Sequence, residues 1–93
     1  MSKEQPTEGR NEMTQAQKFM EIIGSAGWTV AQAAEQLGVN WVSIWRYRGQ
    51  ARHDDGEDIY RENRRAPSPQ IVELAEFKAE KFKREQSNDN ENV

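Results

Sequence analysis

Aromatic and aliphatic residues of this chain are concentrated between Phe19 and Phe82, where they recur every three or four positions, the spacing of amphipathic helices. Both ends lack this periodicity. Residues 1–12 and 86–93 are polar and rich in Glu, Asn and Ser, which predicts disordered tails. The pattern between them predicts one all-α domain over residues 13–85, a small bundle of four to five helices. Roughly 70 foldable residues supply one modest core and no deep catalytic cleft.

Capping signals divide the helical region. Two capping boxes, in which a threonine and a glutamine three residues later satisfy each other's free amides, each begin a helix. They are Thr14 with Gln17, for a helix over 14–26, and Thr29 with Gln32, for a helix over 30–37. Asn40 is a preferred N-cap for a third helix over about 41–48. Ser68 and Pro69 begin the last helix.

Residues 50–66 show no clean periodicity. A turn signal ends at Gly56, and Ile59 and Tyr60 are the only sizeable apolar residues. An ordered loop, a short hairpin and an irregular helical extension all fit this composition. We expect a loop.

The second and third helices should pack across a tight turn. Gly38 stands where the chain must turn, and glycine adopts a positive φ without steric cost. Ala34 is small, as a close crossing of two helices requires. The inward positions are Ala33, Ala34, Leu37, Val39, Ile44 and Tyr47. This spacing resembles the helix-turn-helix of DNA-binding regulators, and we expect a central motif of that kind.

The outward face of the third helix favours DNA. It carries two Trp, two Arg and no acid, whereas a purely structural helix normally exposes Glu, Lys and Gln. Arg46, beside Val42, is the candidate for reading a base, because arginine bridges guanine O6 and N7. Arg48 is nearer the helix end and suits a phosphate. For either arginine the alternative is a surface salt bridge to residues 54–58.

Other residues of the motif have two available roles. Trp41 and Trp45 either contact thymine methyl groups or pack beneath residues 50–66 and complete the core. Thr29, Gln32 and Asn40 lie at helix N-termini, where free amides and the helix dipole favour a phosphate. Capping alone also explains these three residues, and both roles can hold at once.

Charge modifies this picture. The formal net charge of −3 opposes binding to nucleic acid, but the acids concentrate in the tails and the last helix. Arginines gather in the middle of the chain, interspersed with acids: Arg46, Arg48, Arg52, Arg61, Arg64 and Arg65. The distribution allows a DNA-binding face and argues against strong binding to DNA of any sequence.

Several classes of protein are disfavoured. The chain has no cysteine, which excludes disulfides and thiolate metal sites and suits a reducing cytoplasm. It lacks an apolar run of about 20 residues and a signal-peptide core, so we expect a cytoplasmic protein without a membrane span. His53 stands beside several acids but without calcium-loop spacing or a second histidine. We expect no enzyme, no metal and no cofactor.

From Thr14 to about Phe82 the order of elements resembles the lambda-repressor/Cro-like domains of bacterial and phage regulators. The stretches Ser25–Val39 and Arg65–Ala75 carry the likeness. The small size and the Pro-led last helix are also similar to repressors associated with anti-CRISPR operons. The long acidic 50–66 connection and the acidic net charge depart from the family.

The resemblance implies that the third helix enters the major groove. The DNA-facing set is then Asn40, Trp41, Val42, Trp45 and Arg46. Ser43, on the same helix, is a further candidate for DNA binding. The structural positions of the motif are then Ala34, Gly38, Val39, Ile44 and Tyr47.

We expect a sequence-specific regulator of transcription that binds double-stranded DNA, a repressor of bacterial or phage origin that occludes a promoter. One small module reads few base pairs, so a homodimer on a two-fold symmetric operator is expected. The last helix has a wide apolar arc, which leaves Phe77 outside it. The interface candidates are Val72, Phe77 and Phe82; Phe82 also suits the core, and a surface Phe77 can be incidental.

Two alternatives stay open. In an architectural or excisionase-like factor, residues 50–66 would form a β-wing around Asp55 and Gly56. In a protein-interaction module that binds no DNA, Trp41, Trp45 and Phe77 would dock a partner protein.

Overall fold

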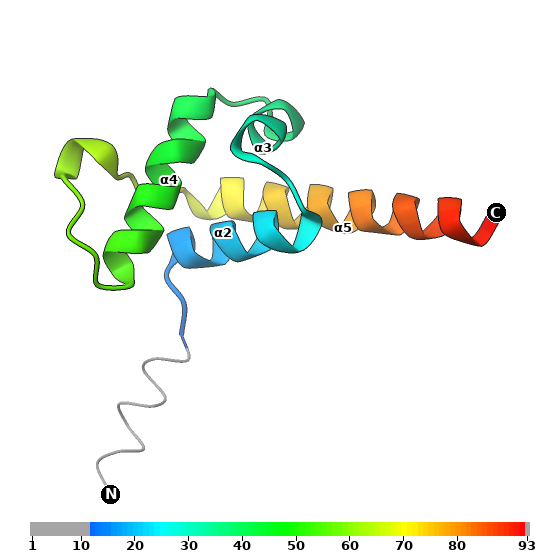
Figure 1. Cartoon of the computed structure of the whole chain (residues 1–93), viewed down its shortest axis with the longest axis horizontal. Coiled ribbons are helices and arrows are strands. Elements are labelled where there is room, and N and C mark those ends of the chain that lie inside the picture. Colours follow the sequence, from blue (N-terminus) through cyan, green and yellow to red (C-terminus); the bar gives the residue numbers. More distant parts are fainter. Residues whose placement is uncertain (1–11, 93) are drawn as a thin grey trace, which may run out of the picture.

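The structure, a computed structural model, describes residues 12–92, with side chains as far as Gln86. Its elements are α2 (Gln15–Ala26), α3 (Val30–Leu37), α4 (Trp41–Asp54), the 3-10 turn η1 (Arg61–Asn63) and α5 (Pro69–Asn92). The described residues contain no strand, so the expected all-α bundle is confirmed. In Figure 1, α2 and α5 form one layer, and α3 and α4 lie against it.

The helix boundaries arise from the predicted capping residues. The Thr14 hydroxyl accepts from the Gln17 amide at 3.2 Å, while the Thr14 amide donates to the Gln17 side chain at 2.9 Å. Thr29 and Gln32 make the same reciprocal pair at 3.1 and 2.9 Å. Gly38 ends α3 with φ of 68°, in the left-handed region that the turn requires.

The core lies between the two layers. Phe19 of α2 and Ile44 of α4 are fully buried, and Tyr47 packs edge-on against Phe19 with ring centroids 5.0 Å apart. Trp28 closes the end of the core against Phe82 of α5, at 5.6 Å between ring centroids. The predicted inward residues of the motif are buried or half-buried, which fixes α3 and α4 as a rigid pair.

The expectation of a loop over 50–66 is wrong at its start. Helix α4 continues to Asp54, six residues beyond the predicted end at 48, because Ala51 is buried at 6% exposure and adds to the core contact. The turn signal is confirmed: the chain turns after α4 at Gly56, with φ of 108°. Residues 57–66, named here the 57–66 segment, then run back beside α4 and include η1 (Figure 1). Because this segment contains no strand, the β-wing alternative finds no structural counterpart.

The two predicted disordered tails have different outcomes. Residues 1–11 of the predicted N-terminal tail lie outside the described residues. Helix α5 is helical to Asn92 and so continues into residues 86–93, where disorder was expected. Helix propagation adds one hydrogen bond per residue once a helix is nucleated, so a polar segment can extend it. In Figure 1 this end of α5 projects well beyond the other helices.

Candidate nucleic-acid interface

Helix α4 presents two parallel rows of side chains that differ sharply in exposure. Both rows follow the i, i+4, i+7, i+11 spacing of a single helical face. The first, named here the exposed stripe, consists of Trp41, Trp45, Arg48 and Arg52, all of them exposed. The second, named here the covered stripe, lies one residue further round the helix and consists of Val42, Arg46, Gly49 and His53, all of them half-buried.

The 57–66 segment accounts for the burial at the middle of the covered stripe. A Cβ built on Gly49 would overlap the carbonyl oxygen of Asn63, so the segment approaches the helix backbone at this glycine. The Arg65 amide donates to the Arg46 carbonyl at 3.1 Å. Gly49 is a mid-helix glycine, normally unfavourable by about 1 kcal/mol, and the close approach of Asn63 explains it.

The arginine assignment changes in the structure. Arg46, the sequence candidate for reading a base, is half-buried, and its Nε is shielded from solvent without a hydrogen-bond partner among the described residues. Arg48, expected to meet phosphate, is instead the exposed arginine between the two tryptophans and Arg52. Of these two arginines, Arg48 is therefore the one whose side chain is accessible to a ligand.

The tryptophans divide between their two proposed roles. Trp41 is 58% exposed and borders a shallow groove of about 430 Å³ between α3 and the start of α4. Trp45 is 37% exposed and lines a small cavity of about 110 Å³ together with Ile59 and Asn63 of the 57–66 segment. Trp41 thus offers its ring to a partner, while Trp45 also supports the segment.

The remaining motif residues have defined tasks within the fold. Thr29 and Gln32 are exposed and cap α3, and the Asn40 side chain accepts from the Val42 amide at 2.8 Å at the start of α4. Ser43 is half-buried. Capping is therefore observed at both N-termini, and their exposed positions leave them open to a phosphate as well.

Arg52 and the arginines of the 57–66 segment belong to the central arginine cluster of the sequence but were not included among the predicted DNA-binding residues. Arg52 completes the exposed stripe and pairs with Glu57 at 3.2 Å, so one alternative offered for Arg46 and Arg48, an ion pair into the acidic region, is made by Arg52. Arg61 and Arg65 are exposed on the segment that flanks α4. The 41, 45, 48, 52 spacing would have identified Arg52 had α4 been predicted at its full length.

The three residues proposed for a dimer interface differ in how exposed they are. Val72 is 5% exposed and packs in the core of its own chain. Its assignment to a dimer interface is therefore wrong, because it is not accessible to a second copy. Phe82 is half-buried against Trp28, which fits its alternative role in the core. Phe77 is 64% exposed on the opposite side of α5 and is the one that remains accessible.

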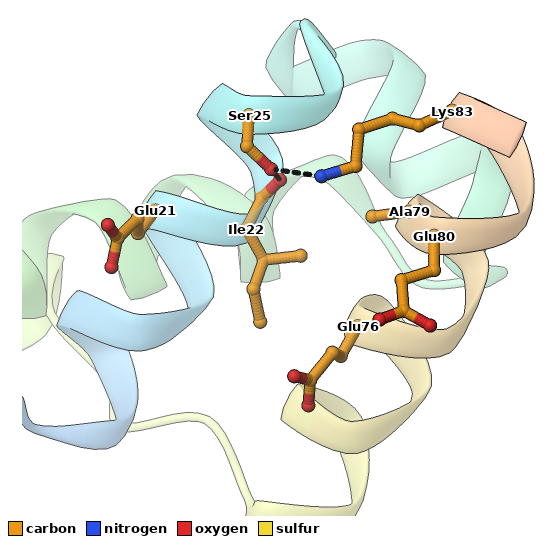
Figure 2. A pocket seen from close by; sticks show the side chains of 7 residues that line it. All are labelled: Glu21, Ile22, Ser25, Glu76, Ala79, Glu80 and Lys83. Atoms are coloured by element: carbon orange, nitrogen blue, oxygen red, sulfur yellow. Dashed lines mark hydrogen bonds between the residues drawn. The ribbon is translucent and has the colours of Figure 1, made fainter. Parts of the chain in front are cut away.

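The surface between α2 and α5 is acidic. A hollow of about 260 Å³ lies there, and Lys83 donates to the Ser25 hydroxyl at 3.2 Å. Figure 2 shows the side chains that line it. Three glutamates also line it: Glu21, Glu76 and Glu80. Acids gathered here repel a polyanion from this side and favour its approach to α4, so the negative net charge is compatible with a nucleic-acid face.

In the part of the chain that the structure describes, a metal site and a membrane-spanning helix have no structural support. Between residues 12 and 92 no three His, Cys, Asp or Glu side chains are grouped as metal ligands. Within the same range, no helix combines the length and apolar character needed to cross a membrane. Comparisons of the chain with protein-family models, with curated proteins and with solved structures find no match.

Proposed function

We propose that this protein is a sequence-specific regulator of transcription that binds double-stranded DNA through α4. The observation that carries the proposal is the exposed stripe: two tryptophans and two arginines that stay exposed on a helix whose other faces are packed. The likeness of the α3–α4 sequence to the helix-turn-helix of lambda-repressor/Cro-like regulators supports the same conclusion.

The stripe suits the major groove of B-DNA, which admits one α-helix. Arg48 is placed to donate to base edges, and the exposed ring of Trp41 offers an apolar surface to thymine methyl groups. The N-terminus of α3, with Thr29 and Gln32, lies on one flank of α4 and supplies amides for a phosphate. Reading by α4 and anchoring by α3 together orient the protein on the duplex.

The regulatory effect follows from size. A module of this length covers a few base pairs, so a homodimer on a two-fold symmetric operator is the functional unit that we propose. Bound across a promoter in the cytoplasm, such a dimer represses by excluding polymerase. Phe77 on the outward face of α5 is the residue available for contact between copies.

Selection from a random pool of double-stranded DNA tests the proposal, because it does not require the operator to be known. The wild-type protein should enrich a motif with two symmetric half-sites. Trp41→Ala and Arg48→Ala should weaken enrichment and relax the motif at the positions that these residues contact, whereas Lys18→Ala, which removes one exposed cation from α2, should retain it in full.

Two outcomes would redirect the proposal. If no sequence is enriched even at low salt, the exposed stripe serves a protein partner instead. If the selected DNA is strongly bent and a reporter under its control is not repressed, the protein is an architectural factor rather than a repressor.

A further inference from the structure

We infer that two copies of this chain associate through an antiparallel contact between their α5 helices, centred on Phe77. The inference rests on the homodimer of the proposed function and specifies which surface forms it and in which direction the helices run.

The outward face of α5 is unpartnered and centred on an aromatic residue. The core contact of α5 is made by Val72, Ala75 and Ala79, which are 5%, 0% and 2% exposed. Phe77 lies half a turn away from these residues and is 64% exposed, and Leu74 at 37% lies one turn before it. Phe77 does not belong to the core cluster, so its exposed surface is available to a second copy.

Charges on this face are distributed unevenly along the helix. Before Phe77 the face carries Glu73 as its charged residue, and after it the face carries Lys81 and Arg84 together with Glu80. The Arg84 guanidinium lies 3.9 Å from the Glu80 carboxylate, whereas Lys81 has no ion-pair partner among the side chains of residues 12–86. Between residues 73 and 84 the first half of this face is thus negative and the second half is net positive.

This distribution selects one direction of pairing. In an antiparallel pair with Phe77 facing Phe77 of the partner subunit, residues equally far before and after position 77 lie level. Glu73 of each copy then lies level with Lys81 of the partner subunit, and Leu74 flanks the central aromatic pair. A parallel pair would instead place each charged residue opposite the same residue of the partner subunit, and two like charges repel each other.

The apolar part of this contact is small, so the association is expected to be weak and sensitive to salt. Sedimentation equilibrium from micromolar to millimolar concentration should show a reversible monomer–dimer equilibrium. Phe77→Glu should yield a monomer with the helical circular dichroism of the wild type. A wild-type chain that stays monomeric throughout overturns both the contact and the homodimer.

Charge exchange tests the register separately. Glu73→Lys alone and Lys81→Glu alone should each weaken dimerisation by about fivefold to tenfold, because two symmetric attractions become repulsions. An equimolar mixture of the two variants should recover wild-type affinity, since each mixed pair matches a lysine with a glutamate at both positions. Glu76→Lys makes the same charge change on the α2-facing side of α5 and should leave dimerisation unchanged.

The outcomes separate the register from the proposed function. If neither Glu73→Lys nor Lys81→Glu changes the dimerisation affinity, the antiparallel register is contradicted but the homodimer is not. In a parallel pair, each of these positions faces a like charge both before and after the substitution. DNA binding by a chain that never dimerises would contradict this contact while sparing the reading by α4. Single reversals that weaken dimers, followed by recovery in the mixture, support the contact as stated.

Discussion

The carbonyl oxygen of Asn63 occupies the space that a side chain on Gly49 would need. This relationship holds the 57–66 segment against α4, while the side chains of the neighbouring exposed stripe stay exposed. In Gly49→Ala the added methyl would meet backbone atoms, so the segment must shift. We expect a loss of about 1–3 kcal/mol in the free energy of unfolding, measured by urea denaturation, despite the better helix propensity of alanine.

Gly24 supplies the matched control. It also lies inside a helix, but a Cβ built there meets nothing within 4 Å. Gly24→Ala should therefore stabilise the protein by up to about 1 kcal/mol. If both substitutions stabilise, the 57–66 segment adapts freely and does not depend on Gly49.

Asp54 links the end of α4 to the start of α2. Its carboxylate accepts from the Thr14 hydroxyl at 2.5 Å and from the Gln50 side-chain amide at 2.9 Å. An acid at a helix C-terminus is ordinarily unfavourable, but here the N-terminus of α2 lies beside it. Asp54→Ala should lower the free energy of unfolding by about 1–2 kcal/mol. Asp58→Ala removes an exposed acid four residues later and should change stability little; equal effects would show that Asp54 acts through net charge alone.

The sequence predicted the motif because its determinants are local. A capping box needs two residues three apart, and a left-handed glycine ends a helix wherever the chain must turn, so Thr29 and Gly38 could be assigned without tertiary knowledge. The inward faces of α3 and α4 followed from helical periodicity alone, as the full burial of Ile44 confirms.

The errors occurred where a long-range contact decides the local structure. The third helix was predicted to end at about 48, yet it continues through Gly49, where the backbone of Asn63, fourteen residues later, leaves no room for a side chain. Arg46 resembled an exposed position because the covering segment could not be placed from the sequence. Val72 fitted both a core and an interface by periodicity, and only the packing of α5 against α2 assigned it to the core.

Because Arg48 and not Arg46 is exposed, substitution of each arginine tests which one reads a base. Arg48 is exposed, so Arg48→Ala should weaken binding to the selected operator by about 1–3 kcal/mol and leave the melting temperature unchanged. Arg46 is half-buried, so Arg46→Ala should lower the melting temperature through lost packing of its aliphatic stem. Fluorescence anisotropy and thermal melting of the same samples check both. The reverse pattern would return the base-reading role to Arg46.

The 57–66 segment lies on the flank of α4 opposite α3 (Figure 1). A helix seated in the major groove lies between two sugar–phosphate strands, so elements on both sides of α4 face phosphates. On one side is the N-terminus of α3, and on the other is the 57–66 segment with Arg61 and Arg65 exposed (Figure 1). The hydrogen bond from the Arg65 amide to α4 fixes the backbone of this segment relative to the stripe.

Arg61→Ala and Arg65→Ala should therefore weaken binding to specific and non-specific DNA alike. Each should reduce the slope of log affinity against log salt by about one per lost phosphate contact, or about two for a dimer. Lys18→Ala removes the same charge from α2 and should leave the slope unchanged, which separates contact from net charge. A slope that is unaltered in both arginine variants would show that the segment only supports α4. A loss of sequence preference without a change in slope would instead place these arginines on bases.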